Sequence, residues 1–143
     1  RSNPVRQVGL GAALAELARN FGELHGIAIQ CDIEPALATL ASEAAETVFR
    51  MSEELLRNIE RHAAARQVQI VLRRAGDDQA CLEVVDDGCG FDPQVLQPGH
   101  YGLVGLHEQA QAIGAQMRID SGRGQGSRVQ ICWLSAPRPN DPA

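Results

Sequence analysis

The segment 42–65 places polar side chains of different chemistry on one face of a predicted helix. Four of them fall within an arc of about 100° when each residue advances the helix by about 100°: Glu54, Asn58, Arg61 and His62. The amide oxygen of Asn58 suits Mg²⁺, which prefers hard oxygen ligands. Arg61 can pair with phosphate oxygens, and Glu54 can orient a group or accept a proton. This face is suited to a metal–phosphate site, although a polar helix face can also be merely solvated.

A second candidate is the stretch VVDDGCGFD at 84–92. A strand ending here would carry Asp86 at its end, followed by Gly88 and Gly90. A carboxylate in that position can accept a hydrogen bond from the exocyclic amine of adenine, and it would repel the carbonyl that guanine presents there. The glycines would let the backbone pass close to a flat ring. A calcium loop or a plain hairpin turn is the alternative.

Two glycine-rich segments follow. GHYGLVGL at 99–106 precedes a predicted helix, so its backbone amides and the helix N-terminus could bind a polyphosphate. A flexible loop leading into an ordinary helix would look similar. GRGQGS at 122–127 fits a hairpin turn equally well.

The elements needed to position these groups can be read from hydrophobic periodicity and turn residues. We expect helices over 8–21, 42–65 and about 104–113, strands over 27–33, 67–74, 79–87, 115–121 and 127–134, and an irregular stretch over 92–102. Ser42 is the expected N-cap of the long helix, and Gly22 and Gly26 are expected to end the first one. This order predicts an α+β fold, a two-layer sandwich in which about three helices cover one face of a mixed, mostly antiparallel sheet.

Composition narrows the class of protein. A chain of 143 residues fits one domain, and its net charge of −5 argues against a nucleic-acid surface. No apolar run approaches the roughly 18 residues of a spanning helix. The chain begins with Arg, so we expect it to be part of a longer protein. The cysteines form no C-x-x-C pair, and we expect small buried thiols in a reducing compartment, with neither disulfide nor zinc: Cys31, Cys81, Cys89 and Cys132.

The order of the motifs is more specific than any one of them. E-x-x-x-N, D-x-G-x-G, G-x-x-G-x-x-G and a final G-x-G-[ST] turn together resemble the Bergerat-type ATP-binding fold. EELLRNIERHA, VVDDGCGF and HYGLVGLHEQA resemble the catalytic ATP-binding domain of sensor histidine kinases, with the nitrate/nitrite-sensor-like subgroup most similar. The resemblance extends from Val8 to Leu134.

The resemblance implies roles for individual residues. Glu54 would help to activate the phosphoacceptor histidine, Asn58 would bind Mg²⁺, and Asp86 would read adenine. The nucleotide-binding set implied by the resemblance also contains Arg61, His62, Gly88, Gly90, Gly102, Leu103, Gly105, Leu106 and Ser127. Ser127 stands where the family usually has Thr, and it would reach adenine through a water.

The resemblance also implies the context of the domain. ATP and Mg²⁺ would be the cofactors, and the acceptor would be a histidine on an upstream dimerisation domain, with onward transfer to an aspartate of a response regulator. We expect 1–7 to be a linker from that domain, 8–135 the catalytic domain and 136–143 a tail. The full-length protein would be a homodimer. This part would be cytoplasmic, without membrane contact, whether or not the whole protein is anchored in the inner membrane. His25 in ELHG is not the expected acceptor, because Gly22 and Gly26 flank it.

Other readings of the same fold stay open. They are an anti-sigma serine kinase-like enzyme, an ATP-gated clamp, and a pseudokinase that binds partners. Gln109 stands where an arginine is common in the family, which keeps the pseudokinase alternative in view.

Overall fold

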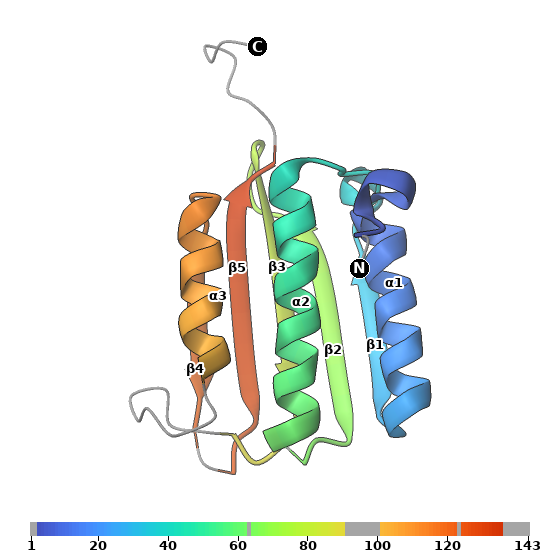
Figure 1. The fold of residues 1–143 in the computed structure, drawn as a ribbon, viewed down its shortest axis with the longest axis vertical. Coiled ribbons are helices and arrows are strands. Elements are labelled where there is room, and N and C mark those ends of the chain that lie inside the picture. The colour runs from blue at the N-terminus through green and yellow to red at the C-terminus, as the bar shows by residue number, and fades with distance from the viewer. Residues whose placement is uncertain (1–2, 63, 91–100, 123, 136–143) are drawn as a thin grey trace.

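Three helices and a five-stranded sheet form two layers, as a computed structural model shows for residues 3–62, 64–90, 101–122 and 124–135. All three helices lie on one face of the sheet (Figure 1). The expected fold class is therefore confirmed. In chain order, the elements are α1 (Val5–His25), β1 (Ala28–Ile33), the 3₁₀ helix η1 (Pro35–Leu37), α2 (Glu43–His62), β2 (Gln67–Arg74), β3 (Gln79–Asp86), α3 (Tyr101–Ala112), β4 (Gln116–Ser121) and β5 (Ser127–Leu134).

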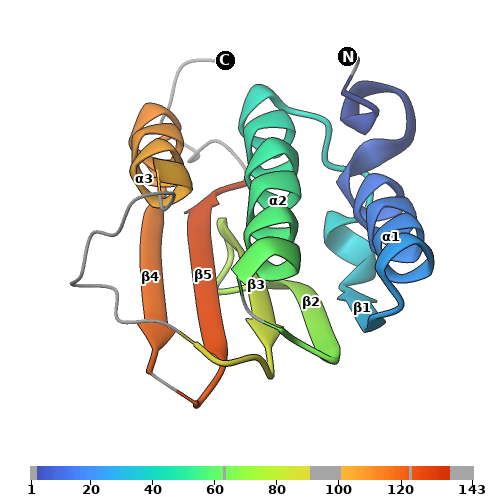
Figure 2. The same ribbon diagram turned by 60° about the horizontal axis from the view of Figure 1, so that its bottom comes forward.

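The strands are ordered β1-β2-β3-β5-β4. β1 pairs with β2 in parallel, and the other three pairs are antiparallel. The sheet is thus mixed and mostly antiparallel, as predicted. Because β3 is central, its end is flanked on one side by the start of β2 and on the other by the start of β5 (Figure 2).

Side-chain alternation separates the two faces of the sheet. In β3, Ala80, Leu82, Val84 and Asp86 are buried on the face that the helices cover. Cys81, Glu83 and Val85 alternate with them and belong to the opposite face. The aliphatic core between the layers also holds Trp133, which is only 1% exposed. The sheet therefore presents Asp86 to the same interlayer space as the hydrophobic core.

Helix α2 begins where a capping residue predicts it. The backbone N–H of Ala45 donates to Ser42 Oγ over 3.1 Å, which satisfies one of the amides left unpaired at a helix start. Glu43 and Glu46 lie in the first turn, where negative charge is favoured by the helix dipole. These local features stabilise the start of α2, the helix that carries the predicted polar face.

Helix α1 differs from the expected one at both ends. It begins at Val5 rather than Val8, with a non-helical kink at Gly9 (φ 85°). A Cβ at Gly9 would lie 2.6 Å from the carbonyl oxygen of Ala38, so glycine is needed for this close approach. The helix runs through Gly22 and stops only at Gly26, whose left-handed φ of 65° ends it. Val5 is fully buried, so the first turn packs on the domain.

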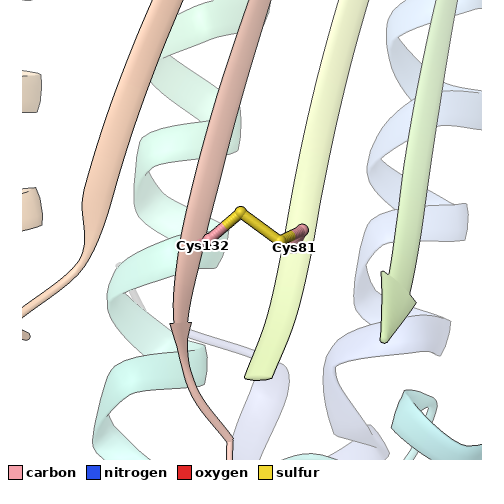
Figure 3. Close-up of a disulfide and its surroundings, with 2 residues drawn as sticks. All are labelled: Cys81 and Cys132. Carbon is pink, nitrogen blue, oxygen red and sulfur yellow. A yellow bond between two sulfur atoms is a disulfide. The ribbon is translucent and has the colours of Figure 1, made fainter. Parts of the chain in front are cut away.

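Two cysteines are joined in a disulfide, which corrects the expectation that none is present. Cys81 of β3 and Cys132 of β5 are direct cross-strand partners with their Cα atoms 4.1 Å apart (Figure 3). Their sequence separation of 51 hid this neighbourhood, because only the strand register reveals it. The inference of a reducing compartment from cysteine usage accordingly loses its basis. Cys31 and Cys89 lie outside this bond.

Within the described ranges, no helix has the length and apolar character needed to cross a membrane.

Candidate nucleotide-binding site

The chain brings its candidate motifs to one end of the sandwich. The last turn of α2, the end of β3, the start of β5 and the first turn of α3 all lie at the lower end in Figure 1, which comes forward in Figure 2. They come from distant parts of the sequence, and the antiparallel strand pairs bring them together.

Asp86 is the buried acid of this region, with an exposed fraction of only 4%. Its Oδ1 accepts a hydrogen bond of 2.8 Å from the backbone N–H of Gly88, and its Oδ2 accepts a short one from Ser127 Oγ. Asp86 and Ser127 are partners in the β3–β5 register. Each carboxylate oxygen can accept a second hydrogen bond, so Asp86 keeps capacity for a ligand donor.

The glycines next to Asp86 fit the backbone of the β4–β5 turn. Gly90 has a φ of 69°, and a Cβ there would lie 2.1 Å from the carbonyl oxygen of Gly122. Gly126 has a φ of 74°, and its Cβ would lie 2.3 Å from the carbonyl oxygen of Asp86. The N–H of Gly124 donates to the carbonyl of Cys89 over 2.5 Å. The motif around Asp86 and the glycine-rich turn therefore interlock, and a side chain at Gly90 or Gly126 would separate them.

The polar residues of α2 lie in its second half. Glu54 is paired with Arg57, three residues later on the same helix. Asn58 is half-buried and Arg61 is exposed. His62 is the last residue of α2. The predicted order along one helix is present, with Asn58 one turn beyond Glu54.

Helix α3 contains both glycines that were expected to contact phosphates. Gly102 lies in its first turn, and Gly105 follows in the next. Among the described residues, no atom would lie within 4 Å of a Cβ at Gly105, so none of them requires a glycine there. Leu106 is fully buried in the core, and Leu103 packs against that core. The sequence predicts an irregular stretch over 92–102 and a helix from about 104, but α3 already begins at Tyr101, so residues 101 and 102 are helical. Gly99 and the rest of that stretch lie outside the described residues.

The surface near the end of β3 is hollowed in two places. One hollow of about 730 Å³ is bordered by Asp86, Ser127 and the β4–β5 turn. Another of about 360 Å³ is bordered by Asp86 and the starts of β1 and β2. Both hollows are also bordered by Val85, which belongs to the face of the sheet opposite the helices, and no α2 residue lines either of them. A cavity shared by Asn58 and Asp86 therefore stays a prediction.

The sequence reading missed Asp87. Its Oδ1 accepts hydrogen bonds from the backbone N–H groups of Arg66 (2.8 Å) and Gln67 (2.9 Å). The hydrogen bond from Gln67, and after it the one from Arg66, hold the pKa of the Asp87 carboxyl below its ordinary value. The only signal in the sequence was the adjacency of two acids, which did not indicate their different partners.

Comparison with known proteins identifies the class. The family model described as histidine kinase-, DNA gyrase B-, and HSP90-like ATPase matches residues 43–138, and the chain belongs to this family. That stretch holds the motif of α2, the D-x-G-x-G segment and both glycine-rich segments. The resemblance to the ATPase domain of sensor histidine kinases is thereby confirmed.

Among individual proteins, the chain is 31% identical over 123 residues to the sensor histidine kinase LiaS of Bacillus subtilis, covering 86% of this chain and 33% of LiaS. It is 24% identical to the nitrate/nitrite sensor protein NarX of Escherichia coli, covering 88% of this chain and 21% of NarX. The chain thus spans about a third or less of these curated relatives. The histidine kinase domain of the blue-light activated histidine kinase EL346 of Erythrobacter litoralis matches with a TM-score of 0.75 and 25% identity, covering 88% of this chain and 61% of that one.

Proposed function

We propose that this chain is the ATP·Mg²⁺-binding catalytic domain of a sensor histidine kinase, with residues 8–135 forming the domain. It phosphorylates a histidine on an upstream dimerisation domain of a homodimeric protein, and the phosphoryl group then passes to an aspartate of a response regulator. Membership of the ATPase family supports nucleotide binding. The similarity to LiaS and NarX supports the sensor-kinase context.

One observation carries the nucleotide assignment: the buried carboxylate of Asp86. A buried carboxylate is costly unless hydrogen bonds compensate for lost water. Ser127 and Gly88 each supply one hydrogen bond and fix the orientation of the group. Each oxygen of Asp86 can accept one more hydrogen bond, which the exocyclic amine of adenine could donate. Guanine has a carbonyl at that position, and its negative partial charge would be repelled by the carboxylate.

The polyphosphate would lie towards α2 and α3. Arg61 is exposed and keeps a full positive charge for phosphate oxygens. The described residues leave open space around a Cβ at Gly105, which supports a phosphate approaching that helix closely. The early amides of α3 add favourable partial charge for an anion.

Mg²⁺ would be bound jointly by Asn58 and by phosphate oxygens of the nucleotide. Asn58 supplies a hard amide oxygen on a helix face that is not sealed in the core. Mg²⁺ keeps several waters and takes substrate phosphate oxygens in sites of this kind. Bound there, it would neutralise charge on the phosphates. Glu54 would act on the acceptor histidine, orienting it or holding its proton.

Titration calorimetry of the chain with Mg²⁺·ATP tests the assignment. We expect measurable binding of ATP and much weaker binding of GTP. Asp86→Asn should weaken ATP binding about 10- to 100-fold, because it replaces a charged acceptor by an amide. Asp32→Asn is the matched control, since Asp32 is an exposed strand carboxylate elsewhere on the sheet. A folded wild-type chain that releases no heat with ATP would overturn the proposal.

The kinase step needs the longer protein that includes the upstream segment. Incubation with γ-labelled ATP should give an acid-labile phosphohistidine, and Glu54→Gln should abolish the label without abolishing ATP binding. An acid-stable phosphoserine on a partner would favour the serine-kinase alternative. ATP binding without any phosphoryl transfer would favour the pseudokinase.

A further inference from the structure

Asp87 connects two parts of the chain that are far apart in sequence. Its carboxylate accepts hydrogen bonds from the amides of Arg66 and Gln67, 21 and 20 residues earlier. Its own N–H donates to the carbonyl of Gln67 over 3.2 Å. Three hydrogen bonds thus join the first residue after β3 to Gln67, the first residue of β2, and to Arg66 just before it.

The segment held in this way is the connection from α2 to β2. It has only four residues, 63–66, between the end of α2 and Gln67. Ala64 has a φ of 50°, a left-handed conformation that costs a non-glycine residue about 1 kcal/mol or more. The carbonyl of Arg66 also accepts a hydrogen bond of 3.0 Å from the N–H of Ala28, at the start of β1. The connection is short, its backbone is strained at Ala64, and Arg66 is hydrogen-bonded to both Asp87 and Ala28.

The consecutive acids Asp86 and Asp87 lie in different surroundings. Asp86 is buried on the helix-covered face, whereas Asp87 is exposed and faces the connection. The two hydrogen bonds from backbone amides favour the ionised form of Asp87. A residue that reads the base and one that fixes the backbone are therefore consecutive in the chain.

We propose that Asp87 is a positioning residue for nucleotide binding: it fastens the α2–β2 connection to the end of β3 and so sets the last turns of α2 relative to Asp86. This inference rests on the proposed function. The last turns of α2 carry Asn58 and Arg61. Arg66, which donates to Asp87, is four residues beyond the end of that helix. Because only three residues separate Arg66 from the end of α2 in the chain, we expect a displacement at Arg66 to shift the helix end.

Three variants separate this role from general stabilisation. Asp87→Ala removes Oδ1, the single acceptor of both hydrogen bonds. Asp87→Asn keeps one carbonyl oxygen that can accept both amides, so it serves as the conservative rescue. Asp32→Ala is the matched control, because Asp32 is also exposed and accepts a side-chain hydrogen bond, from Gln69 Nε2 over 3.2 Å, away from the connection.

The first measurement is amide hydrogen exchange of the nucleotide-free chain. In Asp87→Ala we expect faster exchange at Arg66 and Gln67, with no change in the middle of β3. Asp87→Asn and Asp32→Ala should retain the wild-type rates at both amides. Unchanged exchange in Asp87→Ala would show that the carboxylate does not hold the connection, and it would overturn the inference without reference to ATP.

The second measurement is the affinity for Mg²⁺·ATP. Asp87→Ala should bind about 3- to 10-fold more weakly, which corresponds to the loss of an ordinary hydrogen-bonded constraint. Asp87→Asn and Asp32→Ala should bind like the wild type. If the wild type binds ATP and Asp87→Ala binds equally well, the positioning role is wrong. If the wild type does not bind ATP, the proposed function fails instead. Weak binding by Asp87→Asn with normal exchange would assign the effect to charge and also overturn the inference.

A double variant covers the case in which Asp87→Ala does not fold. Glycine adopts the conformation of Ala64 without steric cost. Ala64→Gly added to Asp87→Ala should therefore restore folding and part of the ATP affinity. A double variant that folds and binds no better than Asp87→Ala would contradict the role assigned to the strained connection.

Discussion

The cross-strand disulfide should make a large contribution to stability. A bond between Cys81 and Cys132 restricts the unfolded chain across a sequence separation of 51 residues. The loop-entropy relation gives a stabilisation of about 4 kcal/mol for a loop of that length. In urea, with a slope of about 2 kcal/mol per molar, loss of the bond would lower the unfolding midpoint by about 2 M.

The assay compares urea unfolding of the oxidised chain with and without a dithiol reductant. Thiol titration of the unfolded chain should find two reactive thiols before reduction and four after it, because the sequence has four cysteines. The double variant Cys81→Ala/Cys132→Ala should unfold at one midpoint with or without reductant. A chain in which Cys31 and Cys89 are both replaced should keep the full response. Four thiols in the chain purified without reductant, or identical midpoints, would refute the reasoning.

The same bond should have little effect on nucleotide affinity. Cys81 belongs to the open face of β3, whereas Asp86 is buried on the helix-covered face. Where both redox forms are folded, we expect ATP affinities within about twofold of each other. A tenfold difference would show that the two faces of β3 are coupled more strongly than side-chain alternation suggests.

Three further outcomes can be measured on the same chain. Gly126→Ala should destabilise it by about 2–4 kcal/mol, because the new Cβ would lie 2.3 Å from the carbonyl oxygen of Asp86. Gly124→Ala has a similar φ but open space around its Cβ, so it should cost only about 1 kcal/mol; equal costs would contradict the packing argument. Ser42→Ala should cost about 1 kcal/mol by removing the cap of α2, and an unchanged denaturation midpoint would argue against that cap. Desolvation raises the pKa of the Cys31 thiol to about 11, so its alkylation rate in the native chain should keep rising to about pH 11; a plateau near pH 9 would contradict this burial effect.

The elements could be predicted from sequence because their signals are local. Alternation in QVQIVLRR and QACLEVVDD identified β2 and β3, and Ser42 identified the start of α2. The kink at Gly9 could not be predicted in this way. It depends on the carbonyl of Ala38, which reaches α1 only through the tertiary fold.

Parts of the site depend on strand register, which motif spacing does not reveal. The sequence placed Asp86 at a strand end, but its partner Ser127 is 41 residues away and becomes a neighbour only through the β3–β5 pairing. The disulfide was missed for the same reason. The sequence predicts ligand clearance at Gly90, which stays a prediction, and it does not reveal that a Cβ there would lie 2.1 Å from the carbonyl oxygen of Gly122.

The D-D-G-C-G motif fixes the backbone around the acid that we propose to read the base. Asp86 directs its carboxylate into the interlayer space, and Asp87 directs its own to the amides that begin β2. Gly90 then meets the turn that precedes Ser127, the residue that donates back to Asp86. Each of these contacts fixes the end of β3 against a different neighbour. Substitutions next to Asp86 should therefore alter binding through backbone position, and their effects should not add when they affect the same neighbour.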